Sequence, residues 1–429
     1  MDVVRAMRNR SRQCNGCRDS GSMIATLPGR GSNLVRLADR YVGIPLVFIM
    51  GNCGRKRAIP ARPEKIGLLN TAAVGDTILM SGPILDLRAV YQNAEIVFFS
   101  GPSNYEAACL LEGSDLVIKL PVFSPLASIK AVREQNIDLL IDFGPWCRIN
   151  ALIAICSGAR FIAGFRTNAQ GRHFGYDLIV EHSEDAHELE NHRGLIRALG
   201  IQPSHPPALR CEQSNAQTVE QSSKKFAVFH LWPGGTAARL KEWPIGRWVA
   251  LAEDFAAKQY NIVLTGSASQ RSLNEAVIVE VNASLRPLLR NAAGTSLHET
   301  LRLLSCAELV VSVDTGVMHM AAALGVPLVA LHGPSSPRRW GPVSENALVV
   351  EPPVGGCGYL NLGFEHRRNP PPCMNAISYG QVKAACQAAL TRAGLGHPTS
   401  LERYSSSTRA LSPVLPVETA PWSRVAQLL

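Results

Sequence analysis

The chain lacks several features that mark common protein classes. No GxGxxG turn follows any of its expected strands, so a dinucleotide oxidoreductase is the least favoured enzyme class. No apolar run approaches the roughly 18–20 residues of a membrane span, and the run at 42–50 reaches about half that length. The first residues include arginines but no apolar h-region beside them, so we expect no signal peptide and a cytoplasmic location.

Cysteine is present in 11 copies, but not in the arrangement of a disulfide framework or a zinc site. The cysteines are scattered and mostly lie inside apolar runs, which favours reduced thiols. Cys14 and Cys17 have a metal-like spacing, yet no second pair follows closely, so we predict no metal site. Cys357 and Cys373 bracket a loop and could pair, although two buried free thiols are favoured.

The positive charge is confined to the N-terminal segment. Residues 1–62 carry 12 Lys/Arg against 3 Asp/Glu, which equals the whole net charge of +9, so the remaining chain is balanced and no nucleic-acid partner is expected. Apolar residues of 33–50 recur at helical spacing with arginines on another face, and Pro45 is expected to end this helix. This helix and the basic residues at 54–57 are suited to binding an anionic membrane surface, so we expect such a contact through residues 33–57. The alternative is that the helix packs against the folded body.

Strand-like apolar runs alternate with helical stretches from residue 64 onward, in two blocks. This pattern predicts an α/β fold of two Rossmann-like, doubly wound domains that face each other across a cleft. The expected division is a basic extension with an amphipathic helix (1–62), a first domain (63–199), a linker (200–224), a second domain (225–393) and a flexible tail (394–429). The expected strands are 66–70, 95–99, 116–119, 138–142, 226–231, 261–265, 309–313 and 327–332.

The strongest local signal, "LVVSVDTGVMHMAAALGVP", lies in the second block. A strand leads through Asp314, Thr315 and Gly316 into a short helix that carries His319 one turn in. Free amides at that helix start could hold a diphosphate, and Gly316 would let it approach closely. The alternative is that Asp314 or Thr315 only caps the helix, and that His319 is a core or surface histidine.

A second signal, "HLWPGGTAARLKEWP", follows the first strand of the second block. Two glycines and Thr236 form a flexible turn, and Lys241 adds a compact positive charge that suits a phosphate. The GxxxxGK[ST] spacing of a Walker motif is absent.

A third signal, "GLLNTAAVGDTILM", opens the first block and places Asp76 at a helix start, where a phosphate would be repelled. The carboxylate could merely complement the helix dipole. At the carboxyl edge of a sheet it could also take a proton from an incoming hydroxyl. The acidic and histidine-rich stretch 181–192 is instead interpreted as a solvated amphipathic helix.

Taken together, these stretches resemble glycosyltransferase family 9, the bacterial lipopolysaccharide heptosyltransferases. The resemblance spans roughly residues 60–390 and some members share the lead-in "DRxxGxPL", similar to "DRYVGIPL" at 39–46. The matching motifs are "KIGLLNTAAVGDTILM", "PGGTAARLKEWP" with one extra residue before the lysine, Asp314 through Pro334 followed by "RRWGP", and Cys373, Met374 and Ile377.

The resemblance implies a GT-B fold and an inverting, metal-independent transfer, usually from ADP-heptose to a lipid A–inner-core acceptor on the inner face of the inner membrane. It implies that Asp76 is the general base. It implies that Lys241 and Thr236 hold the diphosphate, helped by Gly316 and by neighbouring amides such as that of Thr315. It also implies that Asp314 binds sugar hydroxyls and that His319 lines the donor pocket.

No cofactor is expected beyond the nucleotide-sugar donor. The acceptor is expected to be a glycolipid or an oligosaccharide.

The chain departs from the family at Gln270, where relatives often place a donor-contacting glutamate. A nucleotide-sugar epimerase of the same architecture and a non-catalytic nucleotide-sugar-binding protein are the alternative functions.

Overall fold

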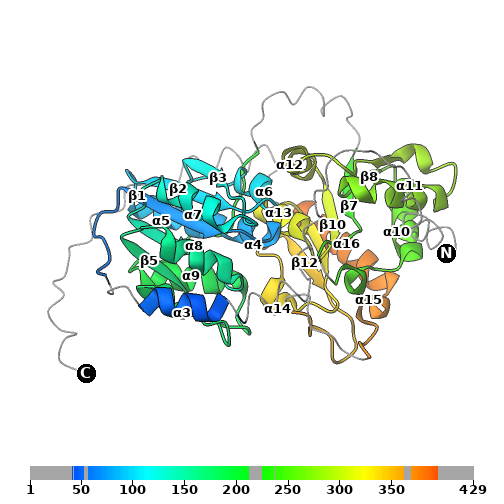
Figure 1. Cartoon of the computed structure of the whole chain (residues 1–429). Helices are drawn as coiled ribbons and strands as arrows, with labels where there is room; N and C mark the ends of the chain where they lie inside the picture. The colour runs from blue at the N-terminus through cyan, green and yellow to red at the C-terminus, as the bar shows by residue number, and fades with distance from the viewer. Residues whose placement is uncertain are drawn as a thin grey trace, which may run out of the picture.

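The computed structural model describes residues 41, 43–52, 57–211, 225–235, 237–361 and 369–394. Across these ranges strands and helices alternate in two blocks, each built around one sheet (Figure 1). Among the described helices, none is both long enough and apolar enough to cross a membrane.

The first sheet has six parallel strands in the order β3-β2-β1-β4-β5-β6. Helices α3, α7 and α8 pack on one face, and α4, α5, α6 and α9 pack on the other. The strands are β1 (Lys65–Asn70), β2 (Glu95–Ser100), β3 (Leu116–Lys119), β4 (Leu139–Asp142), β5 (Phe161–Arg166) and β6 (Leu178–Glu181). The helices are α3 (Ile44–Asn52), α4 (Val74–Leu79), α5 (Ser81–Val90), α6 (Tyr105–Ala108), α7 (Pro125–Arg133), α8 (Arg148–Cys156), α9 (Glu188–Ala198) and the short η2 (His173–Gly175).

The second sheet repeats this plan in the order β12-β11-β10-β7-β8-β9, again all parallel. Helices α10, α11 and α16 cover one face, and α12 and α13 cover the other. The strands are β7 (Phe226–His230), β8 (Asn261–Thr265), β9 (Leu289–Asn291), β10 (Leu309–Val313), β11 (Leu328–Leu331) and β12 (Ala347–Val350). The helices are η4 (Ala238–Lys241), α10 (Ile245–Ala257), η5 (Ala268–Gln270), α11 (Arg271–Glu280), η6 (Arg286–Leu288), α12 (Leu297–Ser305), α13 (Gly316–Ala323), α14 (Pro337–Trp340), α15 (Cys373–Ala376) and α16 (Tyr379–Gly394).

Both sheets are doubly wound, because the first strand of each lies between the second and the fourth. The strand order therefore reverses between β1 and β4 in the first sheet and between β7 and β10 in the second. Ligands of such sheets bind outside the carboxyl ends of the strands at this switch point. The predicted fold class is confirmed, and all eight predicted strands are present.

Four strands escaped prediction: β5, β6, β9 and β12. β5 contains a glycine, and β6, β9 and β12 are short and end their sheets. The predicted strands are continuous β-branched or apolar runs, and β10 is buried along its whole length, as parallel strands covered on both faces require.

The chain passes between the sheets along α5. The Asp86 carboxylate accepts hydrogen bonds from the backbone amides of Ser204 (2.9 Å) and His205 (3.1 Å), and the amide of Leu209 donates to the carbonyl of Ala323 in α13 (3.2 Å). The first part of the predicted linker is thus held against both blocks, while 212–224 and most of the predicted tail, 395–429, lie outside the described residues. The predicted domain boundaries stay predictions.

Pro45 does not end a helix as predicted; it lies in the first turn of α3. Residues 41 and 43 are already π-helical, so the chain is helical on both sides of the proline. The helix consists of the apolar run itself and packs on α8 and η2, with Val47 fully buried. Residues 33–40 of the predicted amphipathic helix lie outside the described residues.

The preference for free thiols at Cys357 and Cys373 is wrong, because the structure joins them in a disulfide with Cα atoms 5.9 Å apart. The loop folds back because the amide of Gly358 donates to the carbonyl of Gly333 (3.0 Å), and a Cβ on Gly333 would stand only 3.2 Å from that of Cys373. Sequence spacing does not reveal such a backbone contact.

Replacing both Cys357 and Cys373 by serine should lower the free energy of unfolding by about 3 kcal/mol, because the bond restricts the unfolded chain over a separation of 16 residues. Urea denaturation without reductant measures this, with the exposed free Cys109→Ser as control. Alkylation of both cysteines in the unreduced, denatured protein would contradict the assignment.

Candidate functional site

Asp76 lies in the first turn of α4, directly beyond the carboxyl end of β1 at the switch point of the first sheet. The turn that leads to it is strained: Ala73 has φ 54° and ψ 132°, a conformation that residues with a side chain rarely adopt. The surrounding structure must therefore hold this turn in place.

Two buried asparagines hold the turn. Asn104 donates from Nδ2 to the carbonyl of Asn70 (2.9 Å) and to the hydroxyl of Thr77 (2.8 Å), and the hydroxyl of Thr71 donates to Oδ1 of Asn150 (2.8 Å). The sequence analysis missed both. Their only signal is an amide side chain placed just after β2 and inside an otherwise apolar α8, which is weak without the fold.

Lys241 and Asp314 meet at the switch point of the second sheet. Lys241 ends η4 after β7, and Asp314 follows β10; the Lys241 Nζ lies 3.1 Å from the Asp314 carbonyl and 3.4 Å from Oδ2. Burial raises the pKa of the Asp314 carboxyl, but the Lys241 charge and neighbouring groups outweigh it and lower that pKa to about 2. The structure therefore brings a lysine and an ionised aspartate together on the predicted donor side.

Thr315 occupies the N-cap position of α13, but its side chain makes no capping hydrogen bond; its hydroxyl lies 3.4 Å from that of Ser312. The simple capping alternative therefore does not describe this residue. Thr236 lies outside the described residues, so the structure does not show its position relative to Lys241.

The starts of α4 and α13, one from each block, touch each other. A Cβ on Gly316 would stand 2.6 Å from Cγ1 of Val74, and one on Gly75 would stand 2.8 Å from Cδ2 of His319. The absence of a side chain at Gly316 thus has a packing reason besides any ligand. Because both helices start at carboxyl edges, the two switch points face each other.

His319 lies in this contact and is 5% exposed. Burial lowers its pKa to about 4, so the ring is neutral at neutral pH. Among the described residues, its Nδ1 has no hydrogen-bond partner. The predicted residues Asp76, Asp314, Gly316 and His319 are thereby brought to one place.

The stretch 181–192 is not the solvated helix that was predicted. His182, Glu188, Asn191 and His192 are all buried, because Glu188 pairs with Arg339 from α14, whose Nη2 lies 2.9 Å from Oε2. An ion pair from a distant segment neutralises the carboxylate, and a local pattern cannot reveal it.

Gln270 uses its side-chain oxygen within its own turn. Oε1 accepts a hydrogen bond from the amide of Ser267 (2.8 Å), forming a capping box at the start of η5. This local role distinguishes it from a side chain aimed at a ligand.

Two doubly wound sheets whose carboxyl edges meet, with a carboxylate on one and a Lys–Asp pair on the other, define a two-domain protein of the GT-B class. Solved structures of this class are similar to it. The Escherichia coli ADP-heptose lps heptosyltransferase II aligns with a TM-score of 0.64 at 23% identity over 77% of this chain and 99% of that chain. A glycosyl transferase family 9 protein from Veillonella parvula aligns with a TM-score of 0.66 at 20% identity over 77% and 98%.

The sequence profile of glycosyltransferase family 9 (heptosyltransferase) matches residues 126–355, more than half of the chain. The Haemophilus influenzae lipooligosaccharide heptosyltransferase 2 is 33% identical over 34% of this chain and 45% of its own length. The Salmonella typhimurium lipopolysaccharide heptosyltransferase 2 is 37% identical over 28% of this chain and 34% of its own length. The chain thus spans between a third and a half of these curated relatives. It belongs to glycosyltransferase family 9.

The lowered pKa of Asp314 predicts how its contribution to stability depends on pH. A folded-state pKa of about 2, against the ordinary value of 3.8, adds about 2 kcal/mol to the free energy of unfolding above pH 4, and this contribution is lost as the pH falls through the folded-state pKa. The difference in unfolding free energy between wild type and Asp314→Asn should therefore shrink between pH 5 and pH 2 in urea titrations. A difference that is constant over this range would contradict the charged state assigned to Asp314.

Proposed function

We propose that the protein is an inverting, metal-independent glycosyltransferase that moves heptose from ADP-heptose to a lipopolysaccharide-core or related glycan acceptor, and that it works on an anionic membrane surface contacted through residues 33–57. Family membership supports the class of reaction, and the E. coli structure described as an ADP-heptose enzyme supports the donor.

The contact between the starts of α4 and α13 carries the proposal. It puts the turn that carries Asp76 against the helix that follows Asp314, whose carboxylate pairs with Lys241. A displacement reaction at a sugar needs a base on the acceptor side of the anomeric carbon and an anion-binding group on the side of the leaving diphosphate.

On the acceptor side, Asp76 takes the proton of the acceptor hydroxyl. The oxygen forms a bond to the anomeric carbon while the bond from that carbon to the diphosphate oxygen breaks, and ADP leaves. A single displacement inverts the anomeric configuration. The Asp76 charge also stabilises the oxocarbenium-like transition state.

On the donor side, Lys241 neutralises charge on the departing diphosphate. The first amides of α13, at Thr315 and Gly316, together with Thr236, donate to its oxygens, so that a lysine and a helix start do the work of a divalent ion. Asp314 binds sugar hydroxyls while it orients Lys241, and the neutral ring of His319 lines the pocket.

An epimerase and a non-catalytic binding protein are the alternatives, and the heptosyltransferase relatives favour transfer over both. Nucleotide release from ADP-heptose, UDP-sugars and GDP-sugars, with and without a lipopolysaccharide-core acceptor, separates the three. Transfer gives acceptor-dependent release of ADP, an epimerase isomerises the sugar, and a binding protein retains the donor intact.

Asp76→Asn should reduce kcat at least ~100-fold, because the amide cannot accept the acceptor proton. The affinity for ADP, measured by calorimetry, should stay within about twofold, since Lys241 and Asp314 belong to the other domain. Glu280→Gln, an exposed carboxylate on α11, is the matched control and should leave kcat unchanged. Wild-type turnover by Asp76→Asn would exclude it as the base.

The membrane contact is supported by the outward side of α3. Leu46, Phe48, Ile49 and Met50 are between 37% and 61% exposed. Arg57 follows in the same segment and is partly exposed, with its guanidinium 3.5 Å from the Asp177 carboxylate. An apolar helix surface with basic residues near it suits an interface of lipid headgroups and acyl chains.

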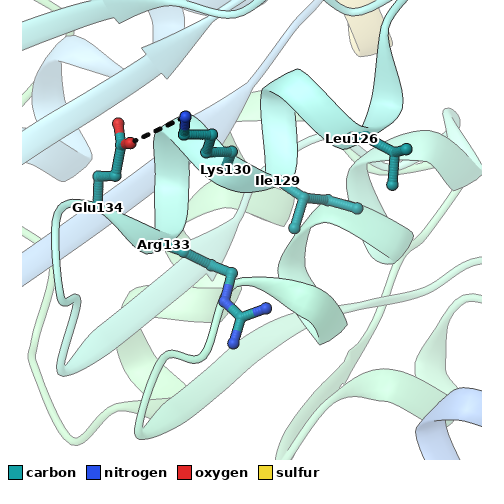
Figure 2. A pocket seen from close by; sticks show the side chains of 5 residues that line it. All are labelled: Leu126, Ile129, Lys130, Arg133 and Glu134. Atoms are coloured by element: carbon teal, nitrogen blue, oxygen red, sulfur yellow. Dashed lines mark ion pairs between the residues drawn. The ribbon is translucent and has the colours of Figure 1, made fainter.

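Helix α7 continues this surface, since α3 and α7 both pack on α8 on the same face of the first sheet. A depression of about 500 Å³ lies along α7. Figure 2 shows the five side chains that line it, which are Leu126, Ile129, Lys130, Arg133 and Glu134. Leu126 is 81% exposed, and Lys130 lies 3.9 Å from Glu134. Because α7 begins at the carboxyl edge of the sheet, Leu126 lies at the same edge as Asp76.

Ile49→Glu should reduce binding to phosphatidylglycerol-containing vesicles several-fold in a sedimentation assay, because it adds negative charge to the docking surface. Val90→Glu is the matched control: Val90 is similarly exposed (54% against 61%) but ends α5 on the opposite face of the sheet. Binding should also weaken at high salt. Equal losses from both substitutions would contradict docking through α3.

A further inference from the structure

Besides the packing contact between α4 and α13, a polar contact joins the two domains. Arg339 belongs to α14 of the second domain, and Glu188 begins α9 of the first. Both side chains are almost fully buried, at 5% and 2% exposure, and their charged atoms lie 2.9 Å apart. Figure 1 shows α14 at the boundary between the two sheets.

The Arg339 guanidinium binds the first domain at three points. Besides Glu188, its Nη1 donates to the carbonyls of Ser183 (3.0 Å) and Ala186 (2.8 Å). On its own side, its Nε donates to the side-chain oxygen of Asn361. A planar fork of fixed N–H groups fits such a set of acceptors, which an ammonium group cannot match.

The Glu188 carboxylate is held ready for this arginine by its own domain. Nε2 of His182 lies 3.1 Å from both of its oxygens, and Nδ2 of Asn191 donates to Oε2 at 3.2 Å. Next to the pair, Nε2 of His187 lies 3.0 Å from the carbonyl of Gly341, a further contact between the domains. Both partners are thus fixed before they meet.

The contact connects to the donor site through a short segment. β11 ends at Leu331, which pairs with Val313 immediately before Asp314, and the chain then continues from Leu331 to Arg339. Movement at Arg339 would therefore be transmitted to the loop beside the donor site.

We propose that Arg339 is a positioning residue: its buried ion pair with Glu188 latches the donor domain onto the acceptor domain and so sets the distance from Asp76 to the donor. The inference rests on the proposed function for its effect on turnover, but the latch itself is independent of it. Arg339 touches no substrate in this scheme and acts through the placement of the two domains. Removal of one partner leaves a buried charge without its counter-charge, which favours opening of the contact so that water reaches Glu188.

The test compares Arg339→Met with Arg338→Met, which removes the exposed neighbouring arginine of the same helix. Small-angle X-ray scattering of the full chain measures the radius of gyration, calorimetry measures ADP affinity, and steady-state kinetics with ADP-heptose and acceptor measure kcat. Arg339→Met should increase the radius of gyration and reduce kcat at least ~10-fold while ADP affinity stays within about twofold. Arg338→Met should match wild type, and Arg339→Lys should fall between the two.

An unchanged radius of gyration and kcat in Arg339→Met would overturn the latch. Loss of ADP binding together with turnover would also overturn it, because Arg339 would then serve the fold of the donor domain. An increased radius of gyration in a protein whose wild type transfers no sugar would support the latch and reject the transferase function.

Discussion

The two domains meet through helix starts that only residues without side chains allow to touch. The side chain of Val74 packs against the backbone of Gly316, and the ring of His319 packs against the backbone of Gly75. Helix starts carry partial positive charge, so two of them in contact repel each other unless negative charge lies nearby. Asp76 supplies one such charge from the first domain, and a diphosphate would supply another. The same constraint therefore favours a carboxylate base and an anionic donor at one place, which a single Rossmann-type turn could not hold together.

The carboxylates of Asp314 and Glu188 near the domain boundary are neutralised in different ways. Asp314 pairs with Lys241 inside one domain, whereas Glu188 pairs with Arg339 across the boundary. The first pair therefore persists if the domains separate, and the second does not. The Lys241–Asp314 pair of the proposed donor site lies within one domain, whereas the position of the proposed base, Asp76, relative to it depends on the contact between the domains.

The sequence predicted what depends on local pattern. Continuous apolar runs gave the strands, and a strand followed by small residues and a helix located Asp76, Asp314 and Gly316. It could not predict the supports of these residues. Asn104 and Asn150 reach the turn of Asp76 from 27 to 79 residues away, and Arg339 reaches Glu188 from 151 residues away. Such contacts exist only once the sheets have formed. Because the local sequence does not show the partner of a charged residue, that residue is predicted to be exposed to solvent even when it is buried.

The strained conformation of Ala73 is likewise not predicted by the local sequence and is maintained by tertiary contacts. Nothing in the motif requires a positive φ at an alanine, and a glycine there would remove the cost of about 1–3 kcal/mol that such a conformation carries. The hydrogen bonds that Asn104 donates and the one that Asn150 accepts offset that cost by fixing the residues on both sides of Ala73. A rigid turn restricts where the Asp76 carboxylate can lie, whereas a relaxed one would let it move. Proton transfer to the proposed base requires its carboxylate within hydrogen-bond reach of one hydroxyl, so rigidity at this turn would serve the proposed role of Asp76 more than a gain in stability would.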